Sequence, residues 1–326
     1  MPMYNRAEVA TLAAKYGFQR DTFEKVLRLK TVLEFFQEEK ILKEHFVLKG
    51  GTSINLTIFP LPRLSVDIDM DYIPNDSKEN MLATRRKITS VVKEYMESEG
   101  YNLSSDSRFG HSLDAFYFRF YFRYQNAVGN RDVMKIELNY SLRAHVLEPT
   151  YKNMLTDAFG DKIQLHTVHP IEIFAAKANA LISRAAARDL YDFSNLVFSG
   201  LFKEKSERDL FRKTIIFYAT ISAEEVNRNF DTKAIDSLSF QKIRRELFPV
   251  LTNQKARSHF DIEQYKTCAK EYLKELMILT PREEEYMDCF IRGEYKPELL
   301  FSDTDILKRV ETHPMALWKC AARGKD

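Results

Sequence analysis

Residues 48–73, LKGGTSINLTIFPLPRLSVDIDMDYI, contain the pattern that decides the fold of this chain. A short apolar run over 45–48 predicts a strand, and two glycines break it. Residues 52–59 have the character of a helical turn, which two prolines end. Apolar and polar residues then alternate over 64–70, which predicts a second strand. The segment therefore predicts a strand, a glycine turn, a short helix and another strand in quick succession.

Two carboxylates lie on the second of these strands. Asp67 and Asp69 are separated by one residue, so both side chains project from the same face. Neighbouring carboxylates repel each other unless a cation lies between them. Mg²⁺ takes oxygen ligands and keeps waters and substrate phosphates in its remaining positions, so the pair predicts a magnesium site, with Mn²⁺ as an alternative ion. The competing interpretation is a solvated face of an edge strand.

The glycine turn has the features of an anion site. Gly50 and Gly51 follow a strand and precede a predicted helix that begins at Thr52. Backbone N–H groups at such a helix start, with the hydroxyls of Thr52 and Ser53, would point at a phosphate. A phosphate held there could also contact the metal on the two aspartates, so the two features support each other.

A third carboxylate is a candidate ligand. In residues 133–140, VMKIELNY, strict alternation predicts a strand on which Lys135, Glu137 and Asn139 share one face. If this strand lies beside the aspartate strand, Glu137 completes a three-carboxylate site for one or two metals. An ordinary Lys–Glu pair on an exposed sheet face explains the pattern equally well.

Outside these segments the chain divides into two parts. The first 44 residues predict two helices, the second opened by a capping-box pattern of Asp21 and Glu24. Further elements are predicted as a helix over 78–99 and strands over 114–124 and 163–168. From Pro170 the chain is helical almost throughout, and Thr280-Pro281 is among its clear helix starts. We expect an α+β fold: a mixed sheet flanked by helices over 1–169 and a helical domain over 170–326.

The helical part contains a second candidate set. On one continuous helix over 170–198, Lys177, Arg184 and Arg188 would lie within about 20° of one line and form a basic stripe suited to a triphosphate. Lys177 is the best candidate for a phosphate contact. Asp189 or Asp192 would position the helix or activate an acceptor hydroxyl. The alternative is a solvated basic face with a weak Arg188–Asp192 ion pair.

Composition restricts the class of protein without giving a function. The chain has 49 basic and 47 acidic residues, so it is no bulk polycation, and this balance is compatible with a local basic groove. Three widely spaced cysteines indicate reduced thiols. We expect a soluble cytoplasmic protein, because neither a signal peptide nor a membrane-spanning apolar stretch is apparent.

One strand has the chemistry of a nucleic-acid surface. In DAFYFRFYFRY, residues 114–124, alternate positions place four phenylalanines on one face and tyrosines with arginines on the other. Tyrosine and arginine stack on bases and bind phosphates. An amphipathic strand over an aromatic core is the alternative. The polar face consists of Tyr117, Arg119, Tyr121 and Arg123.

At these residues the sequence resembles the AbiEii family of nucleotidyltransferase toxins, which includes the MenT toxins and belongs to the DNA polymerase β-like superfamily. The shared residues are KGGT at 49–52, RLSVDID at 63–69, Lys177 with Arg184, RDLYD at 188–192 and the closing HPMALWK at 313–319. The glycine turn followed by RxSxDxD is the specific part, whereas RDxxD alone would be weak.

The resemblance implies a reaction and a set of roles. Asp67 and Asp69 would hold Mg²⁺, and the turn would bind the triphosphate of an NTP while an acceptor hydroxyl attacks the α-phosphate. It also implies a toxin of a toxin–antitoxin or phage-defence system, an antitoxin encoded nearby, and RNA, at the tRNA 3′ end, as acceptor. A protein or small-molecule acceptor is the alternative. The expected nucleotide-binding residues are Lys49, Gly50, Gly51, Thr52, Ser65, Arg184 and Arg188.

Overall fold

The computed structural model describes residues 4–109, 116–222, 228–257 and 261–323 of the chain. The described residues form two compact units. The first comprises Met1–Arg143, Pro149–Thr167 and Pro249–Ser258, and the second comprises Ala144–Glu148, Val168–Phe248 and His259–Asp326. The two units do not divide at residue 170 alone. Residues 144–148 belong to the second unit and residues 249–258 to the first. Each unit is described by itself below.

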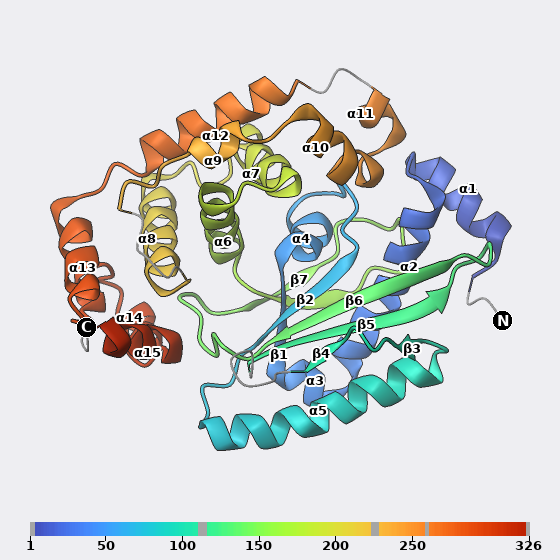
Figure 1. Ribbon diagram of the computed structural model, residues 1–326, viewed down its shortest axis with the longest axis horizontal. Helices are drawn as coiled ribbons and strands as arrows, with labels where there is room; N and C mark the ends of the chain where they lie inside the picture. The colour runs from blue at the N-terminus through green and yellow to red at the C-terminus, as the bar shows by residue number, and fades with distance from the viewer. Residues whose placement is uncertain (1–3, 110–115, 223–227, 258–260, 324–326) are drawn as a thin grey trace. The chain divides into compact units, whose positions relative to one another are not determined.

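The first unit is built on one mixed sheet of eight strands within the described part of the chain (Figure 1). The strand order is β3-β5-β6-β2-β1-β8-β7, with β4 paired to β5. The central strand β2 runs antiparallel to β1 and parallel to β6. The expected mixed sheet is confirmed. The strands are β1 Phe46–Lys49, β2 Asp67–Tyr72, β3 Asn102–Leu103, β4 Arg108–Phe109, β5 Tyr117–Gln125, β6 Arg131–Asn139, β7 Thr150–Asn153 and β8 Gln164–Thr167.

The aspartate strand begins later than its alternation predicts. It starts at Asp67, not at Leu64, because the Leu64 N–H donates to the Val250 carbonyl at 2.7 Å and so lies outside the β1–β2 ladder. The strand predicted over 114–124 begins at Tyr117 among the described residues, and its first two positions lie outside them.

One face of the sheet is the aromatic core of the first unit. Phe46, Tyr72 and Tyr140 contact one another there, with ring centroids 5.2 to 5.8 Å apart. The phenylalanines of β5 are buried on this face, as the alternation predicts. Phe36 of α2 meets Phe46 edge to face, which seats that helix on the sheet. Burial of one face leaves the other available for polar side chains.

The helices of the first unit differ in two details from the sequence expectation. α2 begins at Arg20 with Gln19 as its N-cap, and Glu24 forms a buried ion pair with Arg28 at 2.8 Å in place of a capping box. After β1 the chain forms α4 and then a π-helical turn over Ile54–Ile58. The helices are α1 Arg6–Tyr16, α2 Arg20–Glu38, α3 Lys40–His45, α4 Gly50–Ser53, α5 Lys78–Ser98 and α11 Asn253–Arg257.

The second unit is helical, but the helix expected over 170–198 is not continuous. It breaks after Ser183, and Ala185 adopts a left-handed φ of 41°. Within this unit α6 packs against both α7 and α8, and the capping box at Thr280 is confirmed. The helices are α6 Pro170–Ser183, α7 Ala187–Ser199, α8 Lys205–Ser222, α9 Lys233–Asp236, α10 Phe240–Glu246, α12 Ile262–Leu276, α13 Pro281–Ile291, α14 Thr304–Glu311 and α15 Pro314–Arg323.

Among the described residues, no helix is long and apolar enough to cross a membrane.

Candidate active site

The polar face of the sheet carries an ordered array of charged groups. Because β2, β6 and β5 are in register, their outward residues fall into three rows across the sheet. Asp69 lies beside Glu137 and then Arg119. The rows on either side of it are Asp67–Lys135–Tyr121 and Asp71–Asn139–Tyr117. Residues from three separate strands thus converge on one patch.

Asp69 and Glu137 form the centre of this array. The pKa of the half-buried Asp69 is raised to about 7, first by burial and then by the charge of Glu137 and a hydrogen bond with it. The pKa of Glu137 is lowered: burial works in the opposite direction, but contacts with Lys135, Asp69 and Arg119 outweigh it. Asp69 therefore carries the less well compensated carboxylate of the pair.

Glu137 has cationic partners of its own. Its Oε1 lies 2.7 Å from Arg119 Nε and 2.9 Å from Lys135 Nζ. Within the described part of the chain, no group of three or more Asp, Glu, His or Cys side chains is placed to hold a metal ion. A three-carboxylate centre of Asp67, Asp69 and Glu137 therefore stays a prediction.

The donor chemistry of the two aspartates fits a hard divalent cation. Both side chains offer only oxygen ligands, project from one face of β2 and are half-buried. Mg²⁺ is commonly held by one or two carboxylates and completes its shell with water and phosphate oxygens. A cation there would also relieve the charge that raises the pKa of Asp69.

The glycine turn lies directly against Asp69. Gly50 has a left-handed φ of 71°, and a Cβ built on it would lie 2.8 Å from Asp69 Oδ2. A Cβ on Gly51 would lie 2.7 Å from an Arg63 guanidinium nitrogen and 2.9 Å from Ser65 Oγ. The backbone at Gly50 therefore favours glycine, a side chain at Gly51 would require Arg63 and Ser65 to shift, and the turn brings backbone close to the carboxylate.

The hydroxyls next to the turn, which the sequence predicts to face a phosphate, have hydrogen-bond partners within the protein. Thr52 Oγ1 donates to the Asp67 carbonyl at 2.5 Å and lies 3.0 Å from Ser65 Oγ. Ser53 is fully buried, and its Oγ lies 3.4 Å from Thr57 Oγ1. These contacts tie the turn to the start of β2, so Thr52 and Ser65 lie beside the turn and hold its shape.

A third aspartate was missed by the sequence reasoning. Asp71 continues the alternation of Asp67 and Asp69, and it is 2% exposed. It forms an ion pair with Lys49, the last residue before the turn, and accepts a hydrogen bond from Asn139 Nδ2 at 2.7 Å. The signal was present, since DIDMD places three carboxylates on one face. Only the structure reveals that the third one is buried and paired.

The second unit contains an independent charge cluster. Lys177 Nζ of α6 lies 2.7 Å from Asp189 Oδ1 and 3.1 Å from Asp192 Oδ2 of α7. Asp192 is fully buried, and Asp189 is 5% exposed. The structure thus brings together three of the predicted catalytic residues, and it does so because the chain turns between α6 and α7.

The predicted basic stripe is wrong. Arg184 is the C-cap of α6 and Arg188 lies on α7, so the break after Ser183 removes them from one helical line with Lys177. Arg184 is exposed, with a guanidinium nitrogen 3.7 Å from Asp189 Oδ2. Arg188 Nε donates to the Glu246 carbonyl at 3.0 Å. Lys177 therefore faces carboxylates, and the arginines lie in separate environments.

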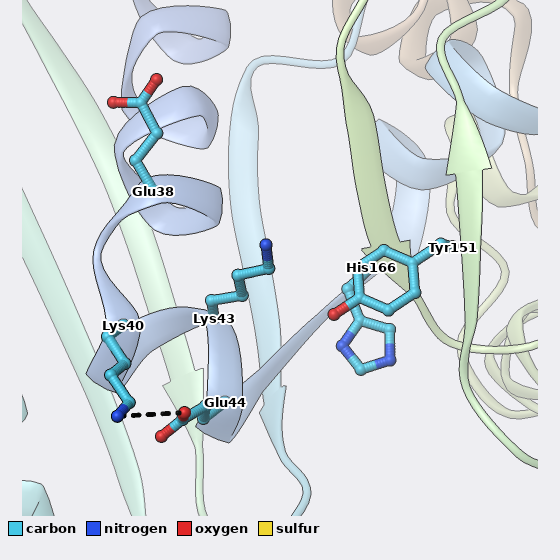
Figure 2. Close-up of a pocket in the computed structure, with 6 residues that line it drawn as sticks. All are labelled: Glu38, Lys40, Lys43, Glu44, Tyr151 and His166. Carbon is cyan, nitrogen blue, oxygen red and sulfur yellow. Dashed lines mark ion pairs between the residues drawn. The ribbon is translucent and has the colours of Figure 1, made fainter.

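A pocket of about 490 Å³ lies elsewhere on the first unit (Figure 2). Tyr151 and His166 stack with ring centroids 4.3 Å apart on one side, opposite Lys43 on α3. Its two lysines and two glutamates balance in charge, so it lacks the concentrated charge of the β2 array. The remaining lining residues are Glu38, Lys40 and Glu44.

Comparison with known proteins places these features in a family. Residues 35–281 match the family described as nucleotidyl transferase AbiEii toxin of type IV toxin–antitoxin systems. This chain belongs to the AbiEii family. The matched region contains the glycine turn, the aspartate strand and the Lys177 cluster.

The AbiEii chain also has the fold of a solved toxin. It is similar to MenT4, a nucleotidyltransferase toxin from Mycobacterium tuberculosis, with a TM-score of 0.59 and 17% sequence identity. The match covers 96% of this chain and 99% of MenT4. Comparison with curated proteins gave no match. At this identity the likeness establishes the α+β fold, and the family match establishes a nucleotidyltransferase of a toxin–antitoxin family.

Proposed function

We propose that this AbiEii protein is a Mg²⁺-dependent enzyme that transfers a nucleoside monophosphate from an NTP to RNA, at the 3′ end of tRNA, and so inhibits translation. Mn²⁺ would serve in place of Mg²⁺. The observation that carries the proposal is the contact between the Gly50 turn and Asp69 on the strand that also holds Asp67. This contact would let a phosphate on the turn meet the ion on the carboxylates.

In the proposed reaction the oxygen of an RNA hydroxyl attacks the α-phosphorus of the NTP. The bond from that phosphorus to the bridging oxygen breaks, pyrophosphate leaves with the electron pair, and the hydroxyl proton passes to solvent. Asp67 and Asp69 would hold the metal, which would offset charge on the triphosphate when bound. The Gly50–Gly51 backbone would contact the phosphates.

For the Lys177 cluster of the second unit we propose the roles that the resemblance to the family implies. Lys177 would bind a phosphate oxygen, and Asp189 would hold its ammonium in position, since these side chains are 14% and 8% exposed. Asp192 is fully buried and would serve as an anchor. Arg184, 74% exposed, would supply further positive charge to the nucleotide.

The polar face of β5 is our candidate for RNA contact. Tyr117, Arg119 and Tyr121 share one side of the strand, opposite the buried phenylalanines. Arg119 is also tied to Glu137, so this face adjoins the carboxylate array. Aromatic rings interleaved with arginines suit single-stranded RNA.

A transfer assay tests the proposal. Purified protein is incubated with each labelled NTP, Mg²⁺ and total tRNA, alongside the variants Asp67→Asn and Asp69→Asn. We expect labelled RNA with at least one NTP, and a loss of at least about 1,000-fold in the variants at unchanged melting temperature. Labelled polypeptide or small molecule would identify a different acceptor. An absence of label on every product would refute nucleotidyl transfer under these conditions.

The biological role needs a separate experiment. Expression of the wild-type protein should arrest growth, and the Asp69→Asn variant should not. Co-expression of the neighbouring gene should restore growth if that gene encodes the antitoxin, and phage challenge would test a role in abortive infection. Growth arrest by both forms would separate toxicity from nucleotidyl transfer.

A further inference from the structure

Asp71 is the third carboxylate on the polar face of β2. Unlike the half-buried Asp67 and Asp69, its side chain is only 3% exposed. A carboxylate this deeply buried must be paired and hydrogen-bonded to remain charged. Its partners therefore indicate what it does.

Two donors converge on one oxygen of Asp71. Lys49 forms an ion pair with Oδ1, and Asn139 Nδ2 donates to the same oxygen at 2.7 Å. Asn139 is oriented in turn, because its Oδ1 accepts hydrogen bonds from Ser141 N at 3.0 Å and Ser141 Oγ at 2.5 Å. These four residues form a chain of contacts that ends at the ammonium of Lys49.

Lys49, where these contacts end, lies next to the proposed phosphate site. Lys49 is the last residue of β1, directly opposite Asp69 in the ladder, and it immediately precedes Gly50. Its side chain is 23% exposed, and its ammonium forms an ion pair with Asp71. An unrestrained lysine has a flexible four-carbon stem and loses side-chain entropy on binding a ligand. Here folding has already fixed the stem.

We propose that Asp71 is a positioning residue that holds Lys49 in place to bind an NTP phosphate at the Gly50 turn. Asn139 orients the Asp71 carboxylate for this task. Asp71 differs from its two neighbours in having its Oδ1 committed to Lys49 and Asn139, so it serves the cation and not the metal. The inference rests on the proposed function, because it names the group that meets the triphosphate there.

A double-mutant cycle on NTP binding tests the inference. The full-length wild-type protein, Asp71→Asn, Lys49→Met and the double variant are titrated with each NTP in the presence of Mg²⁺. We expect the Kd of the preferred NTP to rise about 10-fold or more in each single variant. Adding Asp71→Asn to Lys49→Met should change the Kd less than about 2-fold, because Asp71 acts through Lys49.

Thermal unfolding separates positioning from loss of the fold. Lys49→Met leaves a buried carboxylate without its cation, so the double variant should melt higher than Lys49→Met alone. Lys25→Met and Asp132→Asn serve as controls, since they break a Lys–Asp pair at 3.3 Å in the same unit and should leave the Kd unchanged. An unfolded Asp71→Asn is replaced by Asn139→Ala, for which we expect the same dependence on Lys49.

The results of these experiments distinguish the positioning role of Asp71 from the proposed nucleotidyl transfer. An equal fold-change on adding Asp71→Asn with and without Lys49 would overturn the positioning role and leave nucleotidyl transfer intact. Normal NTP binding by all four proteins would do the same. A wild-type protein that neither binds NTP nor transfers it would overturn both.

Discussion

Asp69 and Glu137 lie directly opposite each other on the neighbouring parallel strands β2 and β6, with their carboxylates on the same face of the sheet. Burial raises the pKa of Asp69 to about 7, and the neighbouring charge of Glu137 adds to this shift. A group whose folded-state pKa exceeds its unfolded value of 3.8 stabilises the protein below that value, and this stability is lost as pH rises through 7.

We therefore expect Mg²⁺ to stabilise the protein more at pH 8 than at pH 6. The ion needs the ionised carboxylate, whose population falls about 10-fold at one pH unit below the pKa. The free energy of unfolding gained from Mg²⁺ should be about 1 kcal/mol larger at pH 8. Thermal melts at both pH values, with and without the ion, measure this.

Asp69→Asn is the control for the metal effect. It removes the titrating group and should abolish both the stabilisation by Mg²⁺ and its pH dependence. Glu137→Gln removes the neighbouring charge, so the pKa of Asp69 should fall and the stabilisation by Mg²⁺ should persist at pH 6. Equal stabilisation of wild type and Asp69→Asn would contradict the assignment of the ion to this carboxylate.

Gly50→Ala should lower nucleotidyl transfer at least about 10-fold. The left-handed φ of 71° costs any residue with an L side chain about 1 to 2 kcal/mol. The new Cβ would also lie only 2.8 Å from Asp69 Oδ2 and would displace that carboxylate. Gly129→Ala is a matched control, since Gly129 has φ of 84° and open space around its Cβ position. It should lose similar backbone stability and keep full activity, so equal activity loss in both variants would argue against a role of the turn.

Lys177→Met should destabilise the protein by about 3 kcal/mol or more, because it leaves the buried Asp189 and Asp192 without their shared ammonium. Arg184→Ala removes an exposed cation 3.7 Å from Asp189 and should cost less than about 1 kcal/mol. Urea unfolding measures both values. Restoring neutrality in Lys177→Met with Asp192→Asn should recover part of the loss, and no recovery would mean that the cluster is not coupled by charge.

Tyr121→Ala should raise the KM for the RNA acceptor about 5-fold or more without changing the Kd for NTP. A base that stacks on a tyrosine ring gains about 1 to 3 kcal/mol, and Tyr121 lies on the polar face of β5. Tyr151→Ala, on the exposed strand β7, is the matched control for loss of a surface tyrosine. If both variants or neither change the KM for RNA, the β5 face is not the acceptor surface.

The sequence by itself determined the parts of the fold that depend on local periodicity. Alternation located the buried and polar faces of β5 and β6, and the spacing of Asp67 and Asp69 placed both on one face of β2. A side-chain period of two makes these assignments independent of which strands are neighbours. The same pattern was available for Asp71.

Only the tertiary structure decided which of these residues meet. The sequence could not pair Asp69 with Glu137 or Lys49 with Asp71, because strand order and register depend on contacts between distant segments. It also failed where helix propensity was overridden: an alanine-rich run predicted one helix, whereas the left-handed residue Ala185 ends it and turns Lys177 toward Asp189 and Asp192. The local sequence thus determined which side chains lie on each face of a strand. Tertiary packing determined which charged side chains pair with one another.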